Sequence, residues 1–184
     1  MKILLIQGAG EGAHAEDQAL ADYLATALGP DCALAYPRFA GLENVDYAAW
    51  KAQAKVELET LGGNGIIVAH SLGGSALLKY LSEEAQGLPI RGLFLIAAPY
   101  KAKDGEWATD DFAMSASFAS TLPELQPLFM YHSQDDEWVP FAHLAQWAEK
   151  LPFAIVRRFD DRGHSFSARP FVELVEDIRS VQNH

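Results

Sequence analysis

The sequence predicts an α/β fold, a three-layer α/β/α sandwich built around a six-stranded, mainly parallel sheet. Short apolar runs alternate along the chain with longer stretches of helical period, as parallel strands alternate with their crossover helices. Several of the runs are apolar almost throughout, which is typical of a sheet covered on both faces. With 184 residues, 49% of them hydrophobic, the chain can bury one substantial core but hardly two. We therefore expect a single domain over residues 1–184.

Six apolar runs are the predicted strands. They cover residues 2–7, 32–36, 65–69, 92–97, 127–132 and 153–159. In the first connecting helix, leucines repeat every four residues from Leu20 to Leu28 and the pattern stops at Gly29. A second amphipathic helix is predicted over residues 47–61, before Gly62. Three further helices are predicted over residues 72–86, 141–150 and 171–180.

Residues 100–122 interrupt this alternation. The segment has no convincing period and is too long for an ordinary connection. It follows the fourth strand at its carboxyl end, the edge where ligands bind in open α/β sheets. Two interpretations are open at this point, a lid insertion over a site or an irregular surface loop.

Composition excludes several classes of protein. Lys and Arg number 14 against 25 Asp and Glu, a formal charge of −11, and no basic run is present to follow a phosphate backbone, so we expect no nucleic-acid partner. Cys32 is the only cysteine, which excludes an internal disulfide and a thiolate metal cluster. The N-terminal apolar run Ile3–Ile6 is shorter than the core of a signal peptide, and no stretch approaches the roughly 20 apolar residues of a membrane span. We expect a cytoplasmic protein with no membrane partner.

A serine stands where the third strand turns into a helix. After residues 65–69 the chain reads His70-Ser71-Leu72-Gly73-Gly74 and then becomes helical. A sharp turn of this kind needs small residues two before and two after the serine, and Ala69 and Gly73 meet that need. The pattern is a nucleophile elbow, G-x-S-x-G with Ala in the first position. It predicts Ser71 as a nucleophile and the N–H of Leu72, at the positive end of the helix, as an oxyanion donor. A serine N-cap in a tight turn is the alternative.

A serine nucleophile needs a base and an acid, which follow it in the order Ser, Asp or Glu, His in such folds. His164 comes directly after the last strand, at the same edge as Ser71, and is the predicted base. Three adjacent carboxylates follow the fifth strand, and Asp136 is favoured by its spacing to Pro140, with Asp135 as the alternative and Glu137 assigned to a helix N-terminus. The other histidines have structural interpretations; they are His14, His70, His132, His143 and His184.

The glycine-rich loop after the first strand has two interpretations. Residues 8–13, read as Gly-Ala-Gly-Glu-Gly-Ala, satisfy a relaxed dinucleotide-binding pattern at a strand-to-helix junction. The second strand, however, ends without the acid that would bind a ribose. The same glycines would let the backbone approach Ser71 and donate a second oxyanion hydrogen bond from the N–H of Ala9. We favour the oxyanion loop, because only that interpretation also uses Ser71, Asp136 and His164.

These motifs together resemble the RBBP9/YdeN family of small serine hydrolases in the α/β-hydrolase superfamily. The likeness covers nearly the whole chain and rests on residues 6–12, 69–74, 136–140 and 163–164. It implies a compact α/β-hydrolase fold with strand order 2-1-3-4-5-6, and carboxylester hydrolysis as the usual activity. Two departures are visible, since Ala69 replaces the more usual glycine and Gln7 stands where many relatives have histidine.

The sequence thus predicts acyl transfer through Ser71, with a small-molecule ester as substrate and no cofactor or metal. Trp107 and Trp138 are candidate pocket residues, although aromatic side chains pack in cores at least as often. A non-catalytic interaction module with this fold is the alternative function, and a dinucleotide-binding protein is a weaker one. The substrate and the oligomeric state do not follow from the sequence.

Overall fold

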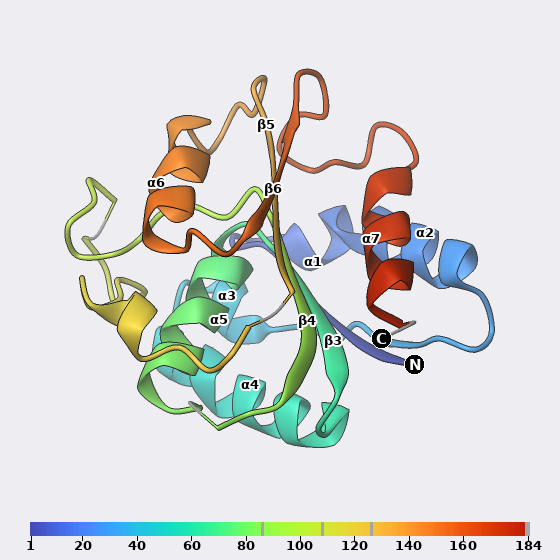
Figure 1. Ribbon diagram of the computed structural model, residues 1–184, viewed down its shortest axis with the longest axis horizontal. Helices are drawn as coiled ribbons and strands as arrows, with labels where there is room; N and C mark the ends of the chain where they lie inside the picture. Colours follow the sequence, from blue (N-terminus) through green and yellow to red (C-terminus); the bar gives the residue numbers. More distant parts are fainter. Residues whose placement is uncertain (86, 108, 126, 183–184) are drawn as a thin grey trace.

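The computed structural model of the chain describes residues 1–184 except 86, 108, 126, 183 and 184. The described residues form a six-stranded sheet of order β2-β1-β3-β4-β5-β6, and every neighbouring pair of strands is parallel (Figure 1). The strands are β1 Lys2–Ile6, β2 Ala33–Ala35, β3 Gly65–His70, β4 Ile90–Ile96, β5 Leu128–Ser133 and β6 Ile155–Phe159. The predicted fold class and strand order are therefore confirmed.

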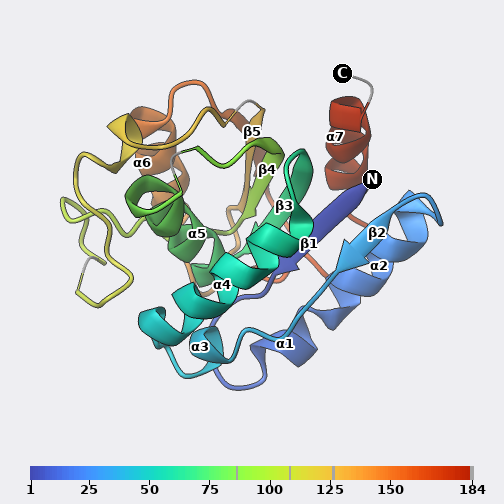
Figure 2. The same ribbon diagram turned by 90° about the horizontal axis from the view of Figure 1, so that it is seen from below.

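Helices cover both faces of this sheet. They are α1 Ala13–Glu16, α2 Gln18–Leu28, α3 Ala40–Glu43, α4 Tyr47–Leu61, α5 Leu72–Glu83, α6 Ala142–Lys150 and α7 Val172–Gln182, with a short 3₁₀ helix at Phe118–Ser120. Helices α3 to α6 lie on one face, and α2 and α7 lie on the other (Figure 2). Among the described residues, no helix combines the length and the apolar character needed to cross a bilayer.

The alternation of side chains along β3 shows why the strand reads as an uninterrupted apolar run. Ile67 and Ala69 pack into the core under α4 and α5. Ile66 and Val68 point the other way, into the second core under α2 and α7. Because successive strand residues face opposite sides, a strand buried on both faces must be apolar at every position.

Several predicted boundaries were wrong. Strand β6 begins at Ile155 and not at residue 153, because a turn closed by Ala154 N–H on the Leu151 carbonyl precedes it and leaves Phe153 exposed. Strand β2 has only three residues, since it is an edge strand that pairs with the first half of β1 alone. Helix α5 ends at Glu83, short of the predicted residue 86, which lies outside the described residues. The three-to-four-residue helices were not predicted because one turn shows no period.

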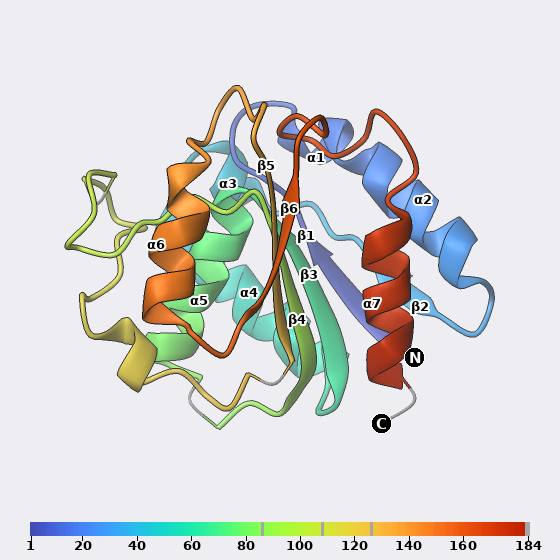
Figure 3. The ribbon, with the colours of Figure 1, turned by 45° about the horizontal axis from the view of Figure 1, so that its top comes forward.

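The segment 100–122 is anchored in the core by its second half. Phe112, Met114 and Phe118 are buried there, and Met114 forms an isolated bridge with Ala102. The ammonium of Lys101 donates to the Trp107 carbonyl at 2.9 Å and to Asp110 at 2.7 Å. Most of the described residues in the intervening stretch 103–111 are exposed, and the segment runs beside α6 (Figure 3). Its role as a lid stays a prediction.

Candidate active site

The loops that follow β1, β5 and β6 all lie at the carboxyl end of the sheet, where β3 turns into α5 (Figure 3). Ser71 occupies that turn, directly before α5, with φ 50° and ψ −132°. A positive φ is uncommon outside glycine and costs free energy, so surrounding contacts must maintain it. The Ser71 N–H donates to the Ile96 carbonyl at 2.8 Å, and the Gly74 N–H donates to the Ser71 carbonyl at 3.0 Å. The turn is thus held from both sides.

Gly73 is required because the end of β1 passes directly against it. A Cβ atom at Gly73 would lie 2.2 Å from the Gln7 carbonyl oxygen and 2.9 Å from Cγ2 of Ile6. At Gly74 the nearest contact would be the Ala98 methyl group, at 3.0 Å. The small residue that the elbow pattern demands after Ser71 therefore reflects a backbone approach, which cannot relax by a rotamer change.

Gly73→Ala is expected to destabilise the fold by about 1–3 kcal/mol, the usual range for overpacking a core. Urea unfolding measures this directly. Gly74→Ala is the matched control and should be much less damaging, because its new methyl group meets a side chain and alanine favours the helix. Equal stability of the two variants would show that the β1 backbone moves aside.

Three side chains from three loops meet above this turn. Nε2 of His164 lies 3.0 Å from the Ser71 hydroxyl oxygen. Nδ1 of the same ring lies 2.9 and 3.0 Å from the two carboxylate oxygens of Asp136. An imidazole in this position can accept the proton of a hydroxyl while a carboxylate holds its other nitrogen protonated. The structure thus brings together Ser71, Asp136 and His164, the three residues selected from the sequence.

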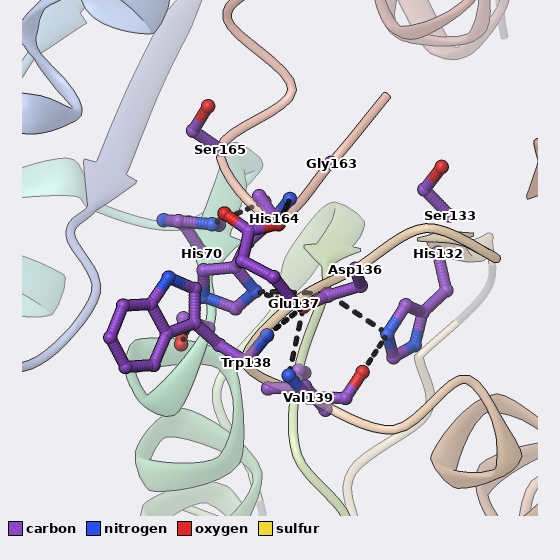
Figure 4. A network of polar contacts seen from close by, with 12 residues as sticks. His70, His132, Ser133, Asp136, Glu137, Trp138, Val139, Gly163, His164 and Ser165 are labelled. Carbon is purple, nitrogen blue, oxygen red and sulfur yellow. Dashed lines mark hydrogen bonds and ion pairs between the residues drawn. The ribbon is translucent and has the colours of Figure 1, made fainter. Parts of the chain in front are cut away.

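The side chain of Asp136 is fully buried and lies between two imidazoles (Figure 4). One oxygen accepts the N–H groups of Trp138 and Val139 at 2.9 and 2.8 Å, and the other is 3.1 Å from Nε2 of His132. Burial raises the pKa of Asp136, but hydrogen bonds from the two histidines and the Val139 amide outweigh it and hold this pKa well below its ordinary value. The carboxylate is therefore ionised at neutral pH.

The neighbouring carboxylates bind backbone groups of the His164 loop. Asp135 accepts the N–H of Gly163 at 2.9 Å, and Glu137 accepts the N–H of His164 at 3.1 Å. The sequence predicts Asp135 as the alternative acid and Glu137 at a helix N-terminus, but the helix that follows, α6, begins only at Ala142. In the structure, Asp136 contacts the imidazole ring while its neighbours hold the loop that carries the ring.

The glycine-rich loop passes beside Ser71. A Cβ atom at Gly8 would lie 3.3 Å from Cβ of Ser71. The loop is fixed on both sides of Ala9, because the Gly8 N–H donates to Asp17 at 2.8 Å and the Gly10 N–H to the Leu42 carbonyl at 3.2 Å. The helix that follows, α1, has four residues, too few to build the dipole that a pyrophosphate site uses. This geometry favours the oxyanion interpretation of the loop over the dinucleotide one.

Two histidines given structural interpretations from the sequence lie in the site. His132 donates from Nε2, which is 3.0 Å from the Val139 carbonyl as well as close to Asp136. His70 bridges Asp17 and the backbone of His164. Their positions at the ends of β5 and β3 were the available signal, because those ends meet at one edge. Asp17 had no comparable signal, since it lies between two helices.

The remaining histidines have contacts outside this network. The ring of His14 stacks on Tyr36 with centroids 4.3 Å apart, and Nδ1 of His143 accepts the Tyr100 N–H at 2.8 Å. His184 lies outside the described residues.

The two tryptophans selected as pocket residues differ in exposure. Trp138 is 71% exposed and follows Asp136 closely in the chain. Trp107 is half-buried and packs edge-on against His143, with ring centroids 4.7 Å apart.

Comparison with known proteins places this site in a family. Residues 38–175, which include Ser71, Asp136 and His164, match the family model described as serine hydrolase. No curated protein sequence matches the chain.

Solved structures with the same fold cover the chain end to end. The ydeN gene product from B. subtilis superposes with a TM-score of 0.70 at 19% identity, over 100% of this chain and 99% of that one. A variant of SOBER1 from Arabidopsis thaliana has a TM-score of 0.70 at 15% identity, over 99% of each chain. A variant of the meta-cleavage product hydrolase from Pseudomonas fluorescens has a TM-score of 0.74 at 15% identity, over 100% of this chain and 90% of that one. The chain belongs to the serine hydrolase family and has the α/β-hydrolase fold of YdeN.

Proposed function

We propose that this hydrolase is a carboxylesterase that cleaves small esters through an acyl-enzyme on Ser71. The observation that supports the proposal most is the unbroken chain of contacts from the Ser71 hydroxyl through His164 to Asp136, at 3.0 and 2.9 Å. A serine hydroxyl is a weak nucleophile at neutral pH, and this chain supplies the base that activates it.

In the proposed reaction, the Ser71 oxygen attacks the ester carbonyl carbon while His164 takes its proton. The N–H groups of Leu72 and Ala9 donate to the oxyanion that forms. His164 then returns the proton to the leaving alcohol, and the acyl group stays on Ser71. A water molecule, deprotonated by His164, attacks this ester and releases the acid. Asp136 keeps the imidazole in the required tautomer and stabilises the imidazolium.

Trp138 forms one wall of the proposed substrate pocket. Its indole is exposed near Asp136 and His164, so an apolar acyl or alcohol group that packs on it would leave water (Figure 4). We also propose that the exposed part of residues 100–122, with Trp107, borders the pocket as a lid, because the segment follows β4, the neighbour of β3. The occupant is a small-molecule ester.

Asp136→Asn is expected to lower kcat for p-nitrophenyl acetate by about 10³- to 10⁴-fold, because the amide no longer selects the tautomer with a free Nε2. Asp135→Asn is the matched control. It keeps an oxygen for the Gly163 N–H and should turn over near the wild-type rate. Equal losses in the two variants would remove the distinct role of Asp136.

A panel of p-nitrophenyl esters with increasing acyl length tests the proposed function and the size of the pocket together. Hydrolysis that falls off beyond a short chain supports a small-ester carboxylesterase. The exposed Trp138 favours one other function, a non-catalytic interaction module. A folded sample that neither hydrolyses the panel nor reacts with a fluorophosphonate would support that module and overturn the esterase.

A further inference from the structure

A second carboxylate and imidazole lie buried behind Ser71, in a place that the proposed chemistry does not use. Nδ1 of His70 lies 2.8 and 2.9 Å from the two oxygens of Asp17, and both side chains are almost completely buried. On the other side of the ring, Nε2 lies 3.0 Å from the backbone carbonyl oxygen of His164. Asp17 also accepts the N–H of Gly8 at 2.8 Å.

Counting donors defines the state of the His70 ring. A carboxylate and a carbonyl oxygen are both acceptors, so each ring nitrogen must carry a proton to bond both. His70 is then an imidazolium with Asp17 as its counter-ion. Burial lowers the pKa of His70, but the Asp17 carboxylate more than reverses this and places the pKa above its ordinary value. Burial raises the pKa of Asp17, and the contact with His70 outweighs it, so that this pKa is lowered.

The pair connects three loops whose relative positions matter for the proposed reaction. The chain of contacts runs from the Gly8 amide to Asp17, through His70 to the carbonyl of the residue that bears the base. Gly8 adjoins Ala9, the proposed oxyanion donor, and His70 adjoins Ser71. We infer that the His70–Asp17 pair is a positioning device, which holds the backbone of His164 and the oxyanion loop at fixed places relative to the nucleophile. This inference rests on the proposed function.

The pair of a His70 imidazolium and an Asp17 carboxylate carries no net charge. The groups that act on the ring are Asp17 from the α1–α2 junction, Asp136 from the loop after β5 and the backbone carbonyl of His164. The rings of His70 and His164 have centroids only 4.8 Å apart. Because the Asp17 carboxylate balances the charge of His70, the pair adds no net charge beside the ring of His164.

Two amide substitutions test the contacts of Nδ1 and Nε2 of His70 one at a time. His70→Asn places an amide nitrogen near the position of Nδ1, so it can still donate to Asp17 but cannot reach the His164 carbonyl. His70→Gln places its amide nitrogen near the position of Nε2, so it can reach that carbonyl and leaves Asp17 with the Gly8 amide alone. A buried carboxylate without its partner is costly, so His70→Gln should have the lower Tm.

The expected order of activity is the reverse of the order of stability. Loss of the tie to the His164 backbone in His70→Asn should lower kcat by about 10- to 100-fold with little change in KM, since small misplacements of a reacting group carry such costs. His70→Gln should keep most of the wild-type kcat. The inference is overturned if the variant with the lower Tm also has the lower kcat. It is also overturned if His70→Asn has the kcat of wild type. Should His70→Gln fail to fold, the pair Asp17→Asn/His70→Gln and Asp17→Asn/His70→Asn repeats the comparison without the unpaired carboxylate.

The protonation of the His70 ring, measured by NMR, tests this inference independently of the proposed esterase activity. Long-range ¹H–¹⁵N correlation spectra of the wild-type protein at pH 7 should show both ring nitrogens of His70 protonated, with the signal assigned by its loss in His70→Asn. A neutral ring, with one unprotonated nitrogen, would overturn the inference in an active enzyme or an inactive one. An imidazolium at His70 in a protein that does not react with fluorophosphonate would instead overturn the proposed function and leave the link between the loops standing.

Discussion

Ser71→Ala is expected to abolish labelling by a fluorophosphonate probe and to lower kcat for p-nitrophenyl acetate by about 10⁵- to 10⁶-fold, the range for loss of a triad nucleophile. The reason is chemical, because the Ser71 hydroxyl stands in the strained turn 3.0 Å from Nε2 of His164, and alanine has no oxygen there. Intact-protein mass spectrometry measures the labelling, and peptide mapping locates the adduct.

Ser180→Ala is the control for this experiment and should label like wild type, since Ser180 is an exposed residue of α7 whose hydroxyl donates to the Asp177 carbonyl at 2.7 Å. The fold should tolerate Ser71→Ala, because alanine is smaller and only the backbone of Ser71 bonds its neighbours in the turn. Equal labelling of wild type and Ser71→Ala would remove Ser71 as the nucleophile, and a labelled peptide elsewhere would identify its replacement.

His164→Ala is expected to cause a loss of similar size, about 10⁵- to 10⁶-fold in kcat, because base and nucleophile act as one unit. The hydroxyl of Ser71 would then lose the group that takes its proton, while Asp136 would keep its contacts with His132 and with backbone amides. Steady-state hydrolysis of p-nitrophenyl acetate measures the loss. Imidazole added to the assay should restore part of the rate, because it can enter the space left by the missing ring.

The matched control for this second result is His14→Ala. The His14 ring stacks on Tyr36, away from the Ser71 contacts, and its removal should leave the rate near that of wild type. An unchanged rate in His164→Ala would show that a different base serves Ser71. A large loss that imidazole does not rescue, together with a lowered Tm, would attribute the effect to the loop and not to proton transfer.

The fold could be predicted from the sequence because local pattern and global structure agree. An apolar run such as residues 65–69 has only one stable environment, between two layers of helices, and the glycines after Leu28 and Leu61 mark where helices end. The strand boundaries that were predicted wrongly depend on contacts with other segments of the chain. The length of β2 is set by β1, and the start of β6 is set by a turn that Leu151 closes, and neither is encoded in the strand itself.

Part of the candidate site could likewise be predicted from the sequence, and part of it could not. Ser71 and His164 could be selected because each needs a strand end and small neighbours, which are local features. Asp136 could be separated from Asp135 only by spacing, while the structure distinguishes them by what each carboxylate contacts, the imidazole in one case and the Gly163 amide in the other. The strand end places His132 at the same edge of the sheet, but its contact with Asp136 could not be predicted, since the neighbouring loop decides which group a histidine at a strand end bonds.

By itself, the sequence determined the order of strands and helices, the edge of the sheet where chemistry is possible, and the side chains able to perform it. Only the tertiary structure decided which buried groups pair, as in the bond from Asp17 to His70, 53 positions apart, and in the support that His70 provides to the backbone of His164. The physical reason is that periodicity records which residues leave water, whereas a buried charge is stabilised by one specific partner at about 3 Å, and that partner is chosen by the packing of distant segments.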